Sequence, residues 1–443
     1  MSPWPEDSQA IPTLVVHNYL ETFHGFLSRT GDDATIWDRR FNGDHGLWWL
    51  GREKLLISTS PIGDAERLSE RWGYVDTHCL YPDKPSFLLS QDILNDGELL
   101  ERLLAHAGPE KKLALVPYAS TPEFLQLSHT LETEYGLNIC LPESPTPENL
   151  WLKDYLDSKV GFRVLVHQWL DAEDVLPFGF ICHNVKQAAE AAKWFKAEGK
   201  GCVVKANQGG SGVGNLFLSL EELQAAEDIL GILQRNAFMQ EDLYVVEEII
   251  PSRDAVSPSL EFYVPAMDHG KPVITYLSNQ HFEDSGRFAG VILGKELFEE
   301  AWYEGFEDWG LTIAAQVQAL GYVGHFDLDA IVGDDGHLYL VEINARRTGG
   351  TYVHEFLMQL FGPDYLEQVA VFSQNKLKSN GIADLVGLEN AFEGLLYPID
   401  EQQRGVILTL TSALEMGSFG YLVVGENIED AQAVRQEMLA RLA

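Results

Sequence analysis

Short apolar runs alternate with more polar stretches over the first third of the chain. A stretch with helical spacing lies near residues 122–135, and the segment 142–148 (PESPTPE) is rich in proline. This alternation of strands and helices predicts an N-terminal α/β domain with a largely parallel sheet, ending at the proline-rich segment. The apolar runs that predict its strands are residues 11–17, 46–59, 113–117 and 138–141.

The rest of the chain mixes helical and strand patterns. Ser219, followed three residues later by Glu222, forms a capping box that predicts a helix start. The polar turn 333–336 between two apolar runs predicts a β-hairpin. Predicted helices cover residues 151–170, 184–198, 220–235, 306–320 and 427–443. Predicted strands cover residues 201–205, 216–218, 244–250, 260–264, 273–277, 325–332, 338–344, 405–412 and 420–424.

The chain is strongly acidic, with a formal net charge of −36 over 443 residues. Such a surface repels nucleic acid and anionic membranes, so we exclude both as partners. It also repels ATP, so the few cations of an anion site should be tightly placed. The N-terminus is polar and acidic, unlike a signal peptide, and no apolar run approaches the ~18 residues of a membrane span. Four cysteines without CxxC spacing argue against a zinc site and for a reducing, cytoplasmic location.

Glycines are concentrated in a loop that follows a predicted strand ending at Lys205. Such a loop lets backbone N–H groups wrap around an anion, and Lys205 adds a positive charge. A P-loop would end in Gly-Lys-Ser/Thr and a dinucleotide-binding fingerprint would open a helix, whereas Gly214 here leads into a predicted strand. A plain flexible hairpin loop is the alternative. The candidate phosphate-binding residues of the loop are Gly209, Gly210, Ser211 and Gly212.

Glu342 and Asn344 are two residues apart on a predicted strand, so their side chains share a face. Asp329 lies on the preceding strand of the predicted hairpin, and Asp327 would share its face. These side chains offer the hard oxygen ligands that suit Mg²⁺ bound to phosphates. The alternative is a solvated acidic hairpin, but an unpaired charge is costly within the apolar run LYLVEINA. Together with the glycine loop, this pattern indicates an enzyme that uses Mg-ATP.

Further segments follow in a specific order: residues 157–163 (DSKVGFR), 203–205 (VVK), the glycine loop, 246–250 (VEEII), Glu261, Asp329 and 342–346 (EINAR). Over about residues 150–360, this order resembles the ATP-grasp superfamily of carboxylate–amine ligases. The resemblance implies a mixed α/β and α+β fold. We expect an N-terminal α/β (pre-ATP-grasp) domain at residues 1–148, two α+β subdomains of an ATP-grasp module at 149–245 and 246–360, and a small C-terminal α+β domain at 361–443.

The resemblance also implies a role for each matching residue. Lys159 and Lys205 would contact the ATP phosphates beneath the glycine-rich lid, although Lys159 is alternatively a surface lysine. Arg346 and Arg287 would steady the transferring phosphate, although a surface role for Arg287 is equally well supported. The hinge Glu247, Glu248 and Ile250 would hold adenine, Glu261 would take the ribose hydroxyls, and Asp329, Glu342 and Asn344 would hold Mg²⁺. The spacing to Glu342 favours Asp329 over Asp327 as the metal aspartate.

The longer layout is similar to that of the peptide ligase of pheganomycin biosynthesis and its relatives. This similarity implies an amide bond, formed through an acyl phosphate, between an amino-acid-like carboxylate and the amine of an amino acid or peptide. The partners are then small molecules, and a homodimer would be in keeping with the superfamily. We expect the backbone of residues 349–351 to line the acceptor pocket, and Tyr19, Glu21, Thr22 or His24 to meet substrate. Alternatives are a phosphotransferase and a non-catalytic nucleotide-binding module.

Overall fold

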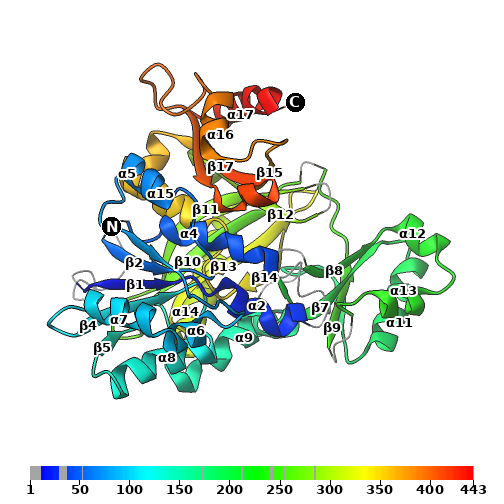
Figure 1. Cartoon of the computed structure of the whole chain (residues 1–443). Coiled ribbons are helices and arrows are strands. Elements are labelled where there is room, and N and C mark those ends of the chain that lie inside the picture. Colours follow the sequence, from blue (N-terminus) through cyan, green and yellow to red (C-terminus); the bar gives the residue numbers. More distant parts are fainter. Residues whose placement is uncertain are drawn as a thin grey trace.

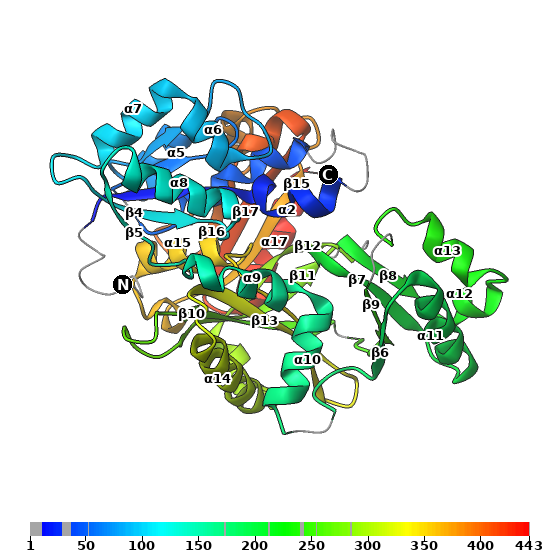
Figure 2. The same cartoon turned by 90° about the horizontal axis from the view of Figure 1, so that it is seen from below.

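The computed structural model describes residues 11–28, 37–51, 53–171, 174–210, 213–239, 243–253, 255–283 and 286–442. These residues form three sheets, of five, eight and four strands. In Figure 1 the four-stranded sheet and its helices project to one side, away from the other two sheets. Figure 2 shows the N-terminal sheet on one side of the eight-stranded sheet and helix α14 (Tyr303–Ala319) on the other. Among the described residues, no helix combines the length and apolar character that a membrane span needs.

The N-terminal sheet is entirely parallel, in the spatial order β3 (His78–Leu80), β2 (Lys54–Ile57), β1 (Thr13–Val16), β4 (Lys112–Pro117) and β5 (Asn138–Cys140). Its central strands are apolar and almost wholly buried, which is typical of a parallel sheet covered by helices. The predicted parallel sheet is therefore confirmed. The helices around it are α2 (Tyr19–Leu27), α4 (Asp44–Leu47), α5 (Ala65–Trp72), α6 (Leu89–Asn95), α7 (Gly97–His106) and α8 (Pro122–Thr133).

One prediction in this domain was wrong, because residues 46–59 are not strands throughout. Helix α4 and a turn occupy the first part, and only β2 is a strand. The carbonyl groups at the end of a helix lack partners within the helix. Here the buried ammonium of Lys54 is their hydrogen-bond partner, since it donates to the carbonyl oxygens of Leu47, Trp49 and Gly51. A lysine on the neighbouring strand thus stabilises a helical turn in an apolar sequence.

The glycine-rich segment belongs to an antiparallel sheet in the order β6 (Gly179–Cys182), β9 (Tyr244–Glu248), β7 (Cys202–Gly210) and β8 (Val213–Leu218). Helix α11 (Val185–Ala197) packs on it through a small apolar core. The predicted capping box at Ser219 is confirmed. The predicted helix 220–235 is instead two helices, α12 (Leu220–Ala225) and α13 (Ile229–Arg235), because the Asp228 side chain accepts a hydrogen bond that starts the second one.

The largest sheet is antiparallel, in the order β14 (Leu338–Asn344), β13 (Gly324–Val332), β10 (Pro258–Val264), β11 (Val273–Phe282), β12 (Phe288–Leu293), β15 (Ala370–Lys378), β17 (Ser418–Gly425) and β16 (Gly405–Leu410). The predicted hairpin of β13 and β14 is confirmed. Strand β12 pairs with β15, so the strands after residue 361 continue the sheet that carries the predicted metal site. The division of the chain into four domains stays a prediction.

The predicted helix 151–170 is also two helices, α9 (Trp151–Asp157) and α10 (Lys159–Trp169). Ser158 lies between them in an extended conformation, and its side chain accepts a hydrogen bond from the amide of Gly161. The break places Lys159 in the first turn of α10. The other helices are α15 (Thr351–Phe361), α16 (Leu385–Ala391) and α17 (Ile428–Leu442), with short 3₁₀ helices η2 (Asp38–Gly43), η3 (Pro147–Asn149), η4 (Lys295–Glu299), η5 (Tyr365–Glu367) and η6 (Ser412–Met416).

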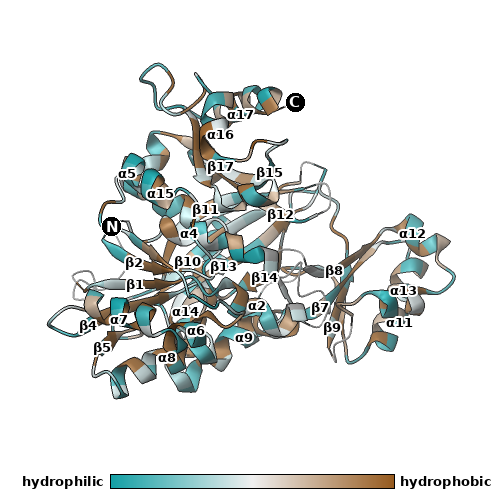
Figure 3. Cartoon of the chain, viewed as in Figure 1, coloured by the Kyte–Doolittle hydropathy of each residue, from teal (hydrophilic) through white to brown (hydrophobic). Residues whose placement is uncertain are grey.

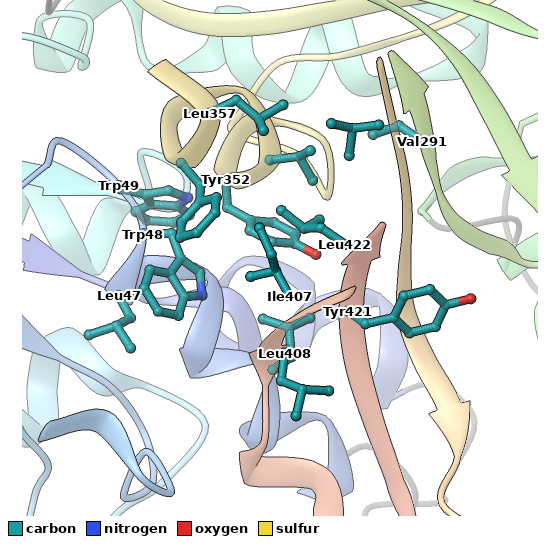
Figure 4. Packing of buried hydrophobic residues seen from close by; sticks show 14 of the residues in the cluster. Leu47, Trp48, Trp49, Val291, Tyr352, Leu357, Ile407, Leu408, Tyr421 and Leu422 are labelled. Atoms are coloured by element: carbon teal, nitrogen blue, oxygen red, sulfur yellow. The ribbon is translucent and has the colours of Figure 1, made fainter. Parts of the chain in front are cut away.

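One apolar core joins the N-terminal domain to the C-terminal strands. Figure 3 shows apolar residues along the strands and polar residues on the outward faces of the helices. Figure 4 shows Trp48 beside Tyr352, with Ile407 and Leu408 of β16 nearby, and all four belong to the same buried cluster. The indole N–H of Trp48 donates a hydrogen bond to the carbonyl oxygen of Thr409 at 3.0 Å. The two ends of the chain therefore share one interior.

A buried ion cluster makes a second connection between these parts. Arg347 is 1% exposed and binds both carboxylate oxygens of Glu143 at 2.7 Å, while its Nη1 donates to Glu355 at 2.7 Å. Glu143 lies in the proline-rich connection after the first domain, and Glu355 lies on α15. Burial opposes each charge, but the attraction between them holds the pKa of Glu143 below its usual range. A charge this deeply buried is stable only with its partners.

Replacing Arg347 with methionine should lower the free energy of unfolding by about 3–5 kcal/mol, because Glu143 and Glu355 would keep buried charges without a partner. Arg253→Met is the control, since Arg253 is 86% exposed in its ion pair with Asp334. That change should cost less than about 0.5 kcal/mol. Denaturant titration followed by tryptophan fluorescence measures both, and small, equal losses would contradict the structural role of the cluster.

Candidate active site

The acidic residues of the hairpin meet at one end of a cavity. In the register of β13 and β14, Asp329 lies opposite Glu342 and Asp327 lies opposite Asn344. The amide of Asn344 donates a hydrogen bond to Asp329 Oδ2 at 3.0 Å, and Gln280 Nε2 donates to Asp329 Oδ1 at 2.6 Å. All five residues line one cavity of about 530 Å³. The structure thus brings together the three predicted metal ligands.

The carboxylates at this end of the cavity oppose one another electrostatically. Burial, and then repulsion from Glu342, raise the pKa of Asp329 to about 7. Burial and the charge of Asp329 raise the pKa of Asp327 well above its ordinary value. Burial also disfavours the charge of Glu342, but the neighbouring ammonium of Lys159 outweighs it and lowers the pKa. Burial and neighbouring carboxylates therefore oppose the ionisation of Asp327 and Asp329.

This donor set fits a magnesium ion. Asp327 Oδ1 is buried and has no hydrogen-bond partner among the described residues. In the described part of the chain, no three His, Cys, Asp or Glu side chains are grouped as a metal site made by protein alone. Mg²⁺ characteristically takes one or two carboxylates and completes its shell with water and substrate phosphates. Asp329, Glu342 and Asn344 match that pattern, and the register places Asp329, rather than Asp327, opposite Glu342.

Two buried lysines approach the hairpin from other elements. Lys159, in the first turn of α10, forms an ion pair with Glu342. Lys205, on β7, forms an ion pair with Glu247 on β9, and Arg163 Nη1 lies 3.2 Å from the same carboxylate. The backbone amide of Val160 donates to Asn207 Oδ1 at 3.0 Å, which ties the start of α10 to β7. The two lysines predicted to hold phosphate are thus fixed by carboxylates.

The predicted hinge and lid lie next to these lysines. Glu248 accepts hydrogen bonds from Lys200 and from the amide of Phe178, and Ile250 follows β9 and is half-buried. The glycine-rich segment joins two antiparallel strands, as expected, and does not open a helix. Gly209 and Gly210 end β7, whereas Ser211 and Gly212 lie outside the described residues.

Gly214 occupies a place that requires glycine. Its φ of +96° is one that other residues rarely adopt, and a Cβ atom would lie 3.1 Å from the ring of Phe26. Phe26 belongs to α2 of the N-terminal domain and also stacks on Phe238, with ring centroids 5.2 Å apart. The glycine-rich hairpin therefore rests on a helix of the N-terminal domain.

The two predicted catalytic arginines reach the cavity from different walls. Arg346 is buried, donates to Asn344 Oδ1 at 2.6 Å and to the hydroxyl of Tyr118 at 3.1 Å, and lies 5.2 Å from the ring centroid of Phe23. Arg287 precedes β12, is 66% exposed and binds the carboxylate of Glu283 at 2.7 Å. Both line the same cavity as the acidic hairpin. Arg346 is held rigidly, whereas Arg287 is held by an exposed ion pair.

The predicted ribose contact of Glu261 finds no support in the geometry. Glu261 is fully buried on β10, and the hydroxyl group of Thr351 donates a hydrogen bond to its Oε2 at 2.5 Å. Its other partners are the hydroxyl groups of Thr275, Tyr276 and Thr348 and the ring of His325. No surface of the carboxylate is open to a ligand in this arrangement, because interior hydrogen bonds occupy it.

Predictions for the substrate side were met in part. Gly349 and Gly350 line the cavity, but Thr351 is buried and binds Glu261. Of the four residues after the first strand, Tyr19 lines the cavity, whereas Glu21 accepts hydrogen bonds from interior partners.

Several residues of the cavity were not identified from the sequence. Tyr118 directly follows β4, and the carboxyl ends of parallel strands are where such sheets bind ligands, so that position carried a usable signal. Nothing in the local pattern marks Arg39, Lys376 or Lys378, which also line the cavity.

No known family model matches the sequence, and no curated protein matches it either. Solved structures do match, over almost the whole chain. Biotin carboxylase of Campylobacter jejuni, as a β-γ-ATP complex, has a TM-score of 0.58 and 13% identity, covering 98% of this chain and 92% of that chain. N5-carboxyaminoimidazole synthetase of Staphylococcus aureus, complexed with ADP, has a TM-score of 0.54 and 11% identity, covering 98% and 97%.

A third match is the N5-carboxyaminoimidazole synthase of Aspergillus clavatus, in complex with ADP and 5-aminoimidazole ribonucleotide. It has a TM-score of 0.54 and 13% identity, covering 98% of this chain and 99% of that chain. Identities this low show the fold alone. They confirm the predicted fold class, which combines an α/β part with a parallel sheet and α+β parts with antiparallel sheets.

His325, on β13, connects Glu261 to the ion cluster of Arg347. Its Nδ1 lies 3.0 Å from Glu261 and its Nε2 lies 3.6 Å from Glu143. Burial disfavours the charged ring, but the charge of Glu143 helps to outweigh it and raises the pKa of His325 to about 9. An unfolded histidine titrates near about 6.5. The charged ring therefore contributes its full stability below that pH and loses it as the pH rises through about 9.

The free energy of unfolding should consequently fall between about pH 6.5 and pH 9, by an amount on the order of 3 kcal/mol from this ring. His325→Gln should flatten that slope, because glutamine cannot carry the charge. His269→Gln, at an exposed loop position, should leave the slope unchanged. Denaturant titrations across this pH range measure the slope, and an unaltered slope in His325→Gln would assign it to other groups.

Proposed function

We propose that this chain is an ATP-dependent carboxylate–amine ligase of the ATP-grasp type. The observation that carries the proposal is the ion pair between Lys159 and Glu342. Lys159 is a cation that can bind phosphate, and Glu342 is a carboxylate that can bind Mg²⁺. Glu342 lies at the end of a cavity that Arg346 and Arg287 also line. The fold supports the proposal, since the structurally similar proteins described above were solved in complex with ADP or as a β-γ-ATP complex.

In this proposal the nucleotide lies between the four-stranded sheet and the eight-stranded sheet. Lys159 and Lys205 bind its phosphates, and the hinge of Glu247, Glu248 and Ile250 lies beside adenine. Their present carboxylate partners would then exchange for phosphate oxygens. Magnesium, bound by Asp329, Glu342 and Asn344, would neutralise the oxygens of the phosphoryl group that is transferred. The glycine-rich hairpin would cover the phosphates and exclude water.

The reaction would proceed in two steps. An oxygen of the substrate carboxylate bonds to the γ-phosphorus of ATP as the bond to ADP breaks, which gives an acyl phosphate. The amine then bonds to the carbonyl carbon, phosphate leaves, and the nitrogen loses a proton. Arg346 would orient the acyl phosphate, because Tyr118 and Asn344 fix its guanidinium at the cavity wall. The protein thus supplies positioning and charge, and no side chain acts as a nucleophile.

For the substrates, we propose an amino-acid-like carboxylate and the amine of an amino acid or peptide. The sequence resemblance to peptide ligases supports this choice. A second support is the cavity itself, which has room for an organic substrate and includes Gly349 and Gly350 in its lining.

The test is ADP and phosphate release from Mg-ATP with amino acids and short peptides, singly and in pairs, with mass analysis of the products. Phosphate release that requires two components, with a product lighter by one water than their sum, would establish the ligase. A stable phosphorylated product from one component would assign a phosphotransferase instead. Nucleotide binding without turnover on any pair would contradict the proposed catalysis.

Glu342→Gln should reduce ADP release by about a hundredfold or more, because the metal site loses a charge. Nucleotide binding, measured by calorimetry without acceptor substrates, should persist through Lys159 and Lys205. Glu132→Gln, on the exposed face of α8, is the matched control and should retain full activity. Normal turnover in Glu342→Gln would show that the metal assignment is wrong.

A further inference from the structure

The large cavity extends well beyond the acidic hairpin, away from the predicted nucleotide site. Its lining includes neither of the lysines Lys159 and Lys205, nor the hinge residues of β9. It continues instead to β15, to the start of β17 and to η2 of the N-terminal domain. In the proposed arrangement, the nucleotide and the bulk of this cavity would therefore lie on different sides of the metal ligands, which leaves the cavity for the organic substrate.

The far part of the cavity is basic. We define the basic wall as Arg39, Arg287, Lys376 and Lys378, all of which line the cavity. Among the residues that the structure describes, the acidic one in the lining of this part is Glu283, and it is ion-paired with Arg287. The whole chain has 31 lysines and arginines against 67 aspartates and glutamates. Cations thus outnumber anions in this wall, although anions outnumber cations in the chain as a whole. A function in binding an anion would explain the difference.

A β-bulge helps to form this wall. In a regular strand, successive side chains point to opposite faces. Residues 375–378 of β15 nevertheless all line the cavity, and the pairing of β15 with β17 shifts register between Gln374 and Leu377. Bulges re-aim side chains in this way. Both lysines are exposed, so holding their charge at the cavity requires little desolvation.

Lys376 and Lys378, the part of the basic wall on β15, are too far from the metal ligands to bind the reacting carboxylate. Going from β13 to β15 crosses β10, β11 and β12, which is four strand spacings and roughly 19 Å of sheet. Arg346 is the cation next to the acidic hairpin. An anion at Lys376 and Lys378 must therefore be a different group of the ligand.

We propose that the cavity binds a substrate with a second anionic group, a carboxylate or a phosphate, which the basic wall holds while the reacting group lies at Arg346. The proposal rests on the proposed ligase function and specifies the class of its organic substrate. Arg39 approaches from the N-terminal domain, where it donates a hydrogen bond to the hydroxyl of Tyr19 at 3.3 Å. The N-terminal domain thus contributes to substrate selection.

The test measures binding without nucleotide, by calorimetry at low ionic strength. The probes are suberate, dodecanedioate and hexadecanedioate, the last of which is long enough to span the separation given above, each compared with the monocarboxylate of the same chain length, and glycerol 3-phosphate compared with glycerol. We expect the dianions, or the phosphate ester, to bind about tenfold more tightly than their matched partners. Added salt should weaken this preference, since the wall is partly exposed. Comparing the dicarboxylates with the phosphate ester shows whether the second anionic group is a carboxylate or a phosphate.

Lys378→Met should weaken binding of the preferred dianion about tenfold and leave monocarboxylate binding unchanged. The double variant Lys376→Met, Lys378→Met should lose more. Lys271→Met is the matched control, because Lys271 is exposed and precedes β11, whose opposite end carries the cavity residues Gln280 and Phe282. Thermal unfolding of each variant confirms that it is folded.

The proposal is overturned if dianions bind no better than monocarboxylates, or if the double variant binds them as well as the unaltered protein. The outcome is separable from that of the ligase proposal. Dianion binding that depends on Lys378, without two-component phosphate release, would leave the site in place and reject the reaction. Phosphate release with a pair of substrates that has no anionic group besides the reacting carboxylate, equally fast in the double variant, would keep the reaction and reject the site.

Discussion

The buried guanidinium of Arg347 is the point on which the arrangement of the molecule depends. It neutralises Glu143, in the connection that leaves the N-terminal domain, and Glu355, on α15. The preceding residue is Arg346, which lines the cavity. A charge at this depth tolerates little displacement, because each lost contact would leave another charge in an apolar interior. The walls of the cavity, contributed by segments far apart in the sequence, are thereby held in one geometry.

Carboxylates fix most of the cations near the cavity and the predicted nucleotide site. Lys159 is held by Glu342, Lys205 and Arg163 by Glu247, and Arg287 by Glu283. In a chain with a net charge of −36, anionic ligands are repelled at long range, so attraction must act at short range. In the proposed function, the carboxylates would keep each cation in position until a phosphate or substrate carboxylate exchanged with them.

Sequence patterns predicted those parts of the site that local structure determines. The hairpin was predictable because a turn joins two adjacent strands, and side-chain alternation then places Glu342 and Asn344 on one face. The burial of Glu261 could not be predicted from the sequence, because its partners Thr351 and His325 come from distant segments. The helix at α4 was missed because Lys54, on another element, completes it. Lys376 and Lys378 reach the cavity through a bulge, and a bulge depends on the partner strand.

The shared eight-stranded sheet bears on how the chain can be divided. Strand β12 has β11 on one side and β15 on the other, so a chain ending near residue 360 would expose a long apolar edge on β12. Such edges recruit strands from other molecules and lead to aggregation. The same cut would uncover Trp48 and Tyr352, which pack against β16. The C-terminal segment therefore covers the edge of β12 and forms a wall of the cavity, and the rest of the chain is not expected to be soluble without it.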